Sequence, residues 1–144
     1  MALYIETKVK FDKMMENGTV KKLNIPYLVD ALSFTEAEAR IIEEVRPFIS
    51  GEFSVSAIKK TKIAEIFRNE TGDRWYNVKV EFISIDERTA TEKKTASHFL
   101  VQACDFRNAL ENFVDGMKGT MADFEIASIT ETKIMDVFDA KLDK

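Results

Sequence analysis

The chain has 144 residues, of which 45% are hydrophobic and 32% are charged, and its net charge is −4. A chain of this length buries enough surface to fold as one domain without disulfides or metals, and its single cysteine, Cys104, excludes an internal disulfide. The charge excludes a globally basic nucleic-acid-binding protein. No apolar run approaches the ~18 residues of a membrane helix, and MALYIETKVK lacks a signal-peptide core. We therefore expect a cytoplasmic protein with no membrane partner.

The two halves of the sequence resemble each other in order, spacing and residue type. The matching segments are YIETKVKF (4–11) and WYNVKVEF (75–82), IPYLVDA (25–31) and SHFLVQA (97–103), FSVSAI (53–58) and FEIASI (124–129), and TKIAEIF (61–67) and TKIMDVF (132–138). This pattern predicts an internal duplication. We expect one domain, 1–144, made of two repeats, 4–67 and 75–138, joined by a linker at 68–74.

The first elements of each repeat read as paired strands. Apolar and polar residues alternate along 4–11, which is the period of a half-buried strand. Asn17-Gly18 predicts a hairpin with a tight type I′ turn, whereas the second repeat has a longer polar loop at 86–94. Pro26 favours a sheet edge for the second strand, because proline lacks the N–H group of a ladder hydrogen bond.

A helix is predicted next in each repeat. Ser33 and Asp105 are suited to cap the two helices, and Glu36 has the capping-box spacing from Ser33. The helical spacing predicts one buried stripe on the first helix, formed by Phe34, Ala37, Ile41, Val45 and Phe48.

The third strand of each repeat ends ambiguously. Ile58 and Ile129 break the alternation at matching places, which indicates a bulge. The segments 61–67 and 132–138 fit either a strand or a short helical turn. We therefore predict an α+β fold in which a ββαβ unit is duplicated. Its two helices pack on one or more antiparallel sheets of six strands in all, and the two copies pack together about a pseudo-twofold axis.

The sequence argues against catalysis. His98 and Cys104 lie on one predicted strand, roughly 20 Å apart at about 3.3 Å per residue, so they form no nucleophilic pair. The Walker A, dinucleotide-binding, HExxH, CxxC and GxSxG motifs are all absent. The many carboxylates of the first helix fit a solvated face. We expect no enzyme, no cofactor and no metal site.

One sheet face combines aromatic and basic residues. Tyr4 and Trp75 occupy the same repeat position, opposite the core-facing side chains, and Lys8, Lys10 and Lys79 follow them on that face. A basic run is formed by Lys59, Lys60 and Lys62. Aromatic rings that stack on bases, beside lysines that pair with phosphates, are typical of single-stranded nucleic-acid binding.

Two alternatives remain open for these residues. The aromatic side chains fill a second core layer, or they form an interface with a second copy of the chain or another protein. The sequence is therefore compatible with a non-catalytic module that binds nucleic acid, with an assembly module that forms a homodimer, and with a small-ligand-binding protein that acts against a host defence system.

The segments YLVDALSFTEAEARIIEE, GEFSVSAIKKTKIAEIF, DRWYNVKVEF and GMKGTMADFEIASITETKIMDVF resemble an uncharacterised family from Bacteroides-type bacteria and their phages. That family is known only as a domain of unknown function, and the resemblance runs from about Tyr4 to Phe138. It implies a setting inside a bacterium or a phage-infected cell and a role in DNA handling. It implies no catalytic residues and no cofactor.

Overall fold

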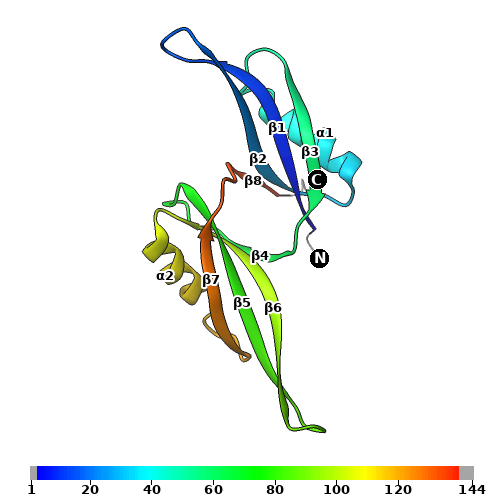
Figure 1. The fold of residues 1–144 in the computed structure, drawn as a ribbon, viewed down its shortest axis with the longest axis vertical. Helices are drawn as coiled ribbons and strands as arrows, with labels where there is room; N and C mark the ends of the chain where they lie inside the picture. Colours follow the sequence, from blue (N-terminus) through cyan, green and yellow to red (C-terminus); the bar gives the residue numbers. More distant parts are fainter. Residues whose placement is uncertain (1–2, 140–144) are drawn as a thin grey trace, which may run out of the picture. The chain divides into compact units, whose positions relative to one another are not determined.

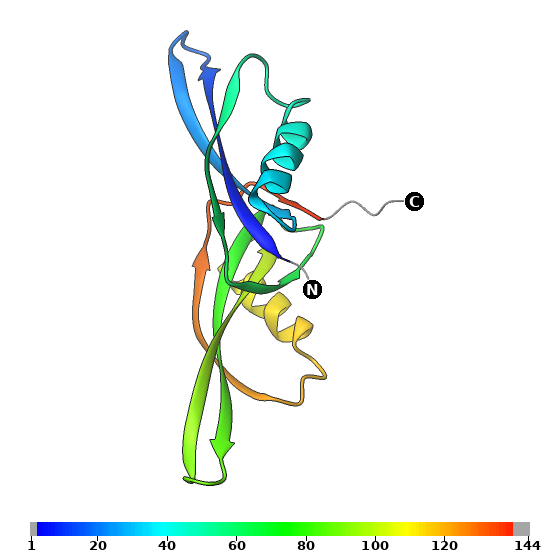
Figure 2. The ribbon, with the colours of Figure 1, turned by 90° about the vertical axis from the view of Figure 1, so that its right-hand side faces the viewer.

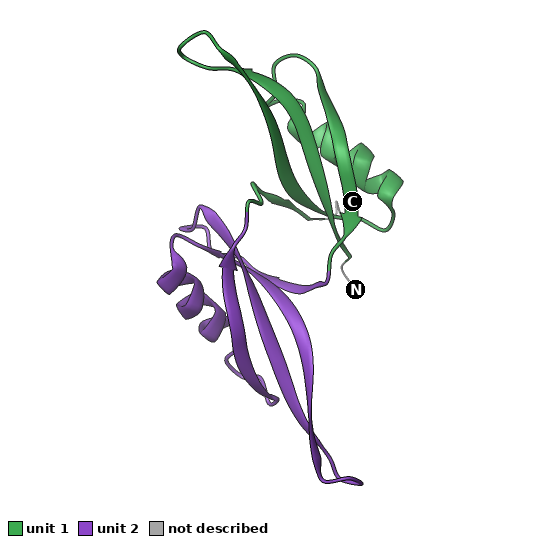
Figure 3. Ribbon diagram, in the orientation of Figure 1, with its two compact units in different colours: residues 1–61, 133–144 green, residues 62–132 purple. Residues whose placement is uncertain are grey.

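A computed structural model describes residues 3–139 of the chain. The chain forms two compact units (Figure 3): unit 1 comprises residues 1–61 and 133–144, and unit 2 comprises residues 62–132. The described residues form eight strands and two helices, arranged as two four-stranded sheets. The fold is therefore α+β, as predicted, although the prediction of six strands is wrong.

Unit 1 is a sheet with the strand order β3-β1-β2-β8 and one covering helix. Its elements are β1 (Tyr4–Met14), β2 (Val20–Asp30), α1 (Phe34–Val45), β3 (Phe53–Lys60) and β8 (Val137–Phe138). β1 pairs antiparallel with β2 and β3, whereas β8 pairs parallel with β2. α1 lies against one face of this sheet (Figures 1 and 2).

Unit 2 repeats this arrangement with the order β4-β6-β5-β7. Its elements are β4 (Ile63–Phe67), β5 (Arg74–Asp86), β6 (Thr91–Ala103), α2 (Phe106–Gly116) and β7 (Asp123–Glu131). β4 pairs parallel with β6, and the other pairs are antiparallel. The sheets are thus mixed, and not antiparallel as expected. The equivalent strands have the same spatial order in both sheets, β3-β1-β2-β8 and β7-β5-β6-β4, which agrees with the hypothesis of a duplication.

The fourth strand of each sheet comes from the other half of the sequence. β4 follows β3 in the chain but lies beside β6 in unit 2, and β8 follows β7 but lies beside β2 in unit 1. The helical-turn alternative for these segments is wrong. A threonine anchors the chain before each crossing: the hydroxyl of Thr61 donates to the Tyr4 carbonyl at 2.7 Å, and that of Thr132 donates to the Trp75 carbonyl at 2.8 Å.

Each unit has its own hydrophobic core, and an exchanged strand contributes to it. In unit 1, Phe138 of β8 packs on the core formed around Ile5 and Ile41, and its ring stacks on Tyr27 with centroids 5.9 Å apart. In unit 2, Phe67 of β4 packs against Phe99 and Phe113, with centroid distances of 5.5 and 5.9 Å. Aromatic pairs at these distances add to the free energy of burial. Each core is therefore completed by the other repeat.

The predicted bulges are confirmed. The pairing of β1 with β3 shifts register between Lys8 and Val9, and the pairing of β5 with β7 shifts between Lys79 and Val80. Ser56 and Ala127 are the extra residues. The bulge turns Ile58 and Ile129 back toward the helix side, where both pack on the core.

The predicted β1–β2 hairpin is present, but its turn type is different. Gly18 has a φ of +83°, whereas Asn17 does not have a positive φ, which a type I′ turn requires. The Met15 N–H donates to the Thr19 carbonyl at 2.8 Å around a loop of three residues. Three-residue loops place a glycine in the left-handed region at this point.

Pro26 lies in β2, which is an inner strand only where β8 pairs with Leu28 and Val29. The Leu28 N–H donates outward, to the Asp136 carbonyl at 3.0 Å. Because N–H groups two residues apart along a strand point the same way, the backbone nitrogen of Pro26 also points away from β1. The missing N–H group therefore costs no hydrogen bond to β1.

Both helix caps form as predicted, whereas the buried stripe is shorter than predicted. Ser33 accepts from the Glu36 N–H at 3.1 Å, and Asp105 accepts from the Asn108 N–H at 2.8 Å. The side chain of Glu36 reaches the Leu32 N–H and not that of Ser33. α1 buries Ala37, Ile41 and Val45. Phe34 is the first residue of α1 and Phe48 lies beyond its last residue, and both are exposed.

The strand exchange predicts that the two halves stay associated after the chain is cut. A protease site inserted after the exposed Glu70 gives fragments 1–70 and 71–144 on cleavage. We expect them to elute together in size-exclusion chromatography, because β4 stays paired with β6 and β8 with β2. The variant Phe67→Ala removes roughly 3–5 kcal/mol of packing and should release the fragments at lower urea concentrations. Separation of the unsubstituted fragments in buffer would contradict the exchange.

Gly72 is predicted to be intolerant of a side chain. A Cβ atom there would lie 2.6 Å from the backbone N and Cα atoms of Ala103, which cannot move aside. Gly72→Ala should therefore lower the free energy of unfolding by about 2–3 kcal/mol in urea titrations. Gly119→Ala is the matched control, because its Cβ meets nothing within 4 Å and only its φ of +88° opposes the change. It should cost about 1 kcal/mol, and equal losses for the two variants would refute the steric account.

Tyr27 predicts a loss of stability at high pH. Burial raises the pKa of the Tyr27 hydroxyl above its usual value of 10.0, and the nearby negative charge of Asp136 raises it further. The native state therefore favours the neutral phenol. The resulting stabilisation is fully present below pH 10 and is lost as the pH rises through the raised pKa. Between pH 9 and 12, the free energy of unfolding measured by chemical denaturation should decline less for Tyr27→Phe than for the unchanged protein. Equal declines in the two proteins would contradict this role of Tyr27.

Candidate functional site

Trp75 does not form the open stacking face that the sequence predicted. Its side chain is only 2% exposed, and the guanidinium carbon of Arg68 lies 5.7 Å from the centre of its ring. Tyr4, at the matching position of unit 1, is half-buried. A base can stack only on an exposed ring, so Trp75 as it lies in this structure offers no platform for single-stranded nucleic acid.

The lysines predicted for the site differ in their surroundings. Lys59 forms an ion pair with Glu6, its neighbour across the strand pair, with Nζ and Oε2 3.0 Å apart. Lys8 and Lys79 are half-buried at equivalent places on β1 and β5. The remaining three, Lys10, Lys60 and Lys62, are exposed. Among the predicted residues of unit 1, Lys10 is the one that continues into a larger basic surface.

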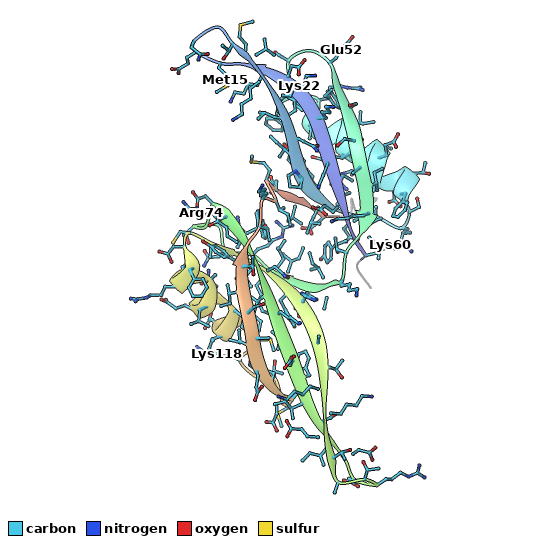
Figure 4. The ribbon with its side chains drawn as sticks, in the orientation of Figure 1. Met15, Lys22, Glu52, Lys60, Arg74 and Lys118 are labelled. Atoms are coloured by element: carbon cyan, nitrogen blue, oxygen red, sulfur yellow. The ribbon has the colours of Figure 1, made fainter. Side chains whose placement is uncertain are left out.

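That surface is the end of the β1–β2 hairpin. β3 pairs with β1 only as far as Phe11, so both strands of the hairpin continue beyond the three-stranded part of the sheet as a ribbon (Figures 1 and 4). We call residues 8–22, which include this end of the hairpin and the adjoining part of β1 that still pairs with β3, the basic ribbon; its exposed lysines are Lys10, Lys13, Lys21 and Lys22.

Like charges face each other on the basic ribbon. Lys13 and Lys21 are direct cross-strand partners, whereas Lys22 is opposite Asp12. Directly opposed like charges destabilise a strand pair. From residue 8 to residue 22 the chain has five lysines and only two acidic residues, Asp12 and Glu16. The ribbon therefore carries a positive charge although the whole chain is acidic.

The tip of the basic ribbon is apolar. Met14 and Val20 are cross-strand partners next to the lysine pair, and both are largely exposed. Met15 begins the turn and is also exposed; Figure 4 shows it at the end of the hairpin, with Lys22 further down the strand. Exposed apolar side chains at the end of a charged ribbon are unusual on a surface that only faces water.

The matching ribbon of unit 2 is electrically balanced. From residue 79 to residue 94 the chain has four basic and four acidic residues. The Lys94 ammonium donates to Glu125 at 3.4 Å, and this hydrogen bond raises the pKa of Lys94. Lys93 lies opposite Ser84 and not opposite another lysine. The predicted loop at 86–94 was too long, since β6 begins at Thr91.

The histidine, cysteine and acidic side chains of residues 3–139 are the groups from which a metal site could be built. That part of the chain contains no cluster of three or more histidine, cysteine or acidic side chains able to hold a metal. His98 is half-buried with its Nδ1 atom 3.4 Å from the side-chain nitrogen of Asn77, and Cys104 is exposed.

Open hollows of about 370 and 280 Å³ lie beside α1 and α2. The first is lined by Ile42, Arg46, Phe53 and Val55, and the second by Phe67, Arg68 and Asn112. No helix within 3–139 is long and apolar enough to cross a membrane.

The sequence prediction missed Lys13, Lys21 and Lys22, because it ended the first strand at Phe11 and began the second at Ile25. The signal that could have found them is the spacing of lysines about Asn17-Gly18. The predicted two-residue turn would place Lys13 opposite Lys22, and the three-residue loop of the structure places it opposite Lys21, so both arrangements oppose two lysines.

Comparison with known proteins identifies a family but no activity. No curated protein and no solved structure matches the chain. A family model described as "Domain of unknown function (DUF4494)" matches residues 3–140. Because this match spans nearly the whole sequence, the protein belongs to the DUF4494 family.

Proposed function

We propose that this protein is a non-catalytic module that binds nucleic acid through the basic ribbon of unit 1. The observation that supports the proposal is the opposed pair Lys13 and Lys21, at the end of a ribbon with five lysines and two acidic residues. The equivalent ribbon of unit 2 has balanced charge. The positive charge is therefore a local property of one hairpin and not a requirement of the fold.

A polyanion relieves the electrostatic cost of this arrangement. Two ammonium groups on directly opposed positions repel each other in the unbound protein. Phosphate groups placed beside them replace repulsion with attraction and release counterions from the nucleic acid, which makes the affinity dependent on salt. Lys10 and Lys22 lie on the other face of the same ribbon, so phosphates of more than one strand or turn are within its reach.

The shape of the ribbon favours a duplex over a single strand. A two-stranded β-ribbon fits the major groove of B-DNA. Single-strand binding depends mainly on stacking, and of the two predicted aromatic rings only Tyr4 is partly exposed. The apolar tip formed by Met14, Met15 and Val20 fits a wedge between base steps, as methionine and other apolar side chains do in proteins that kink DNA.

The role in DNA handling, in a bacterial or phage-infected cell, belongs to the same proposal. It is supported by the sequence resemblance alone. The absence of catalytic activity is proposed on the missing sequence motifs and on the lack, among the described residues, of a group of three side chains able to hold a metal.

A matched pair of double variants tests the proposal. Lys21→Ala/Lys22→Ala removes two charges from the basic ribbon, and Lys93→Ala/Lys94→Ala removes two from the equivalent positions of unit 2. Binding to a labelled duplex and to the corresponding single strand is followed by fluorescence anisotropy between 50 and 200 mM NaCl. We expect the first variant to bind the duplex roughly tenfold more weakly and to lower the slope of log K against log salt by about two. The second variant should bind like the unchanged protein.

Two results would refute the proposal. One is the lack of any salt-dependent binding of the unchanged protein to either nucleic acid at 50 mM NaCl. The other is an equal loss of affinity in both double variants, which would show that the positions on the basic ribbon have no special role. Tighter binding of the single strand than of the duplex would contradict the assignment of a duplex ligand.

A further inference from the structure

α2 has a row of exposed apolar side chains that do not contribute to the core of unit 2. Phe106, Leu110 and Val114 are 57%, 37% and 48% exposed, and each follows the previous one by four residues. Residues with this spacing form a continuous ridge along a helix. The core of unit 2 instead takes Ala109 and Phe113 from the neighbouring face. We call the three exposed residues the α2 stripe.

A charged residue interrupts the matching row of unit 1. When the cap residues Ser33 and Asp105 are aligned, the stripe corresponds to Phe34, Glu38 and Ile42 in α1. A charged residue is therefore compatible with this central position of the fold. Only α2 has an uninterrupted apolar row here, and contiguous exposed apolar surface of this kind marks a site of association.

We propose that the α2 stripe binds the α2 stripe of a second copy of the chain, as an antiparallel pair about a twofold axis. With Leu110 on the axis, it contacts Leu110 of the partner subunit. Phe106 then lies opposite Val114 of the partner subunit, because both are four residues, or about 6 Å, from the centre.

Charged residues beside the stripe are complementary in this arrangement. At about 100° per residue, Arg107 and Glu111 both lie on the flank of the stripe that is remote from Phe113. A twofold axis perpendicular to both helices brings the same flank of each helix together. Arg107 therefore meets Glu111 of the partner subunit, about 3 Å away along the helix axis, and the symmetry repeats this ion pair.

The inference does not depend on nucleic-acid binding. The α2 stripe belongs to unit 2, whereas the basic ribbon belongs to unit 1. Failure of the DNA-binding experiment would leave the proposal of self-association untouched. Failure of the self-association experiment would likewise leave the proposal of DNA binding untouched.

Sedimentation equilibrium over a range of protein concentrations tests the interface. We expect a monomer–dimer equilibrium for the unchanged protein and a monomer for Leu110→Glu. Val114→Glu is a second disrupting variant, and Leu32→Glu is the matched control, because Leu32 is an exposed leucine of unit 1 that should leave the dimer intact. A monomeric unchanged protein at high concentration would overturn the proposal, as would a dimer that persists in Leu110→Glu and Val114→Glu.

Charge reversal tests the antiparallel arrangement. Arg107→Glu or Glu111→Arg alone creates like-charge contacts twice in the dimer, and each should weaken it roughly tenfold. The double variant Arg107→Glu/Glu111→Arg restores opposite charges and should recover the affinity of the unchanged protein. A double variant no tighter than the single ones would overturn the twofold antiparallel pairing.

Discussion

Parallel pairing of β4 with β6 and of β8 with β2 is the constraint on which both units depend. A parallel strand cannot reach its partner through a tight turn, so its chain must arrive from elsewhere. Here it arrives from the other repeat, and it brings a phenylalanine that packs on the core: Phe67 in unit 2 and Phe138 in unit 1. Gly116 is part of the same arrangement, because a side chain there would collide with the ring of Phe67. The helix, the sheet edge and the exchanged strand of unit 2 are therefore matched to one another.

The local features of the fold could be predicted from the sequence because they follow from short-range physics. Alternation predicts β1, the caps of α1 and α2 follow from Ser33 and Asp105, and the parity change at Ile58 predicts the bulge. The partners of β4 and β8 could not be predicted. A short apolar run such as IAEIF fits any uncovered sheet edge, and nothing within it specifies an edge in the same repeat or in the other one. Phe34 and Phe48 show the same limit, since helical spacing alone does not reveal which residues near the ends of a helix are covered.

In the candidate site, equivalent positions of the two repeats differ in their exposure. Tyr4 and Trp75 occupy equivalent places in the two repeats, yet the first is half-buried and the second almost fully buried. Period-two alternation assigns a side chain to a face of a sheet but does not indicate what covers that face. Lys13, Lys21 and Lys22 of the basic ribbon were missed for a different reason. Lysine is poorly represented in strands, so a strand that continues through Lys13 and Lys21 is easily ended too early. The two repeats differ in the charge of their hairpins and in the outer faces of their helices, where packing in the core does not determine the residue type.

The exchange of strands also determines when each unit becomes complete as the chain leaves the ribosome. Protein domains commonly fold in the order in which they are synthesised. Unit 2 has all of its strands once residue 131 has emerged, whereas unit 1, which contains the first residues of the chain, lacks β8 until residues 137 and 138 appear. The N-terminal unit is thus the last to be closed, and until then β2 has no partner strand at Leu28 and Val29.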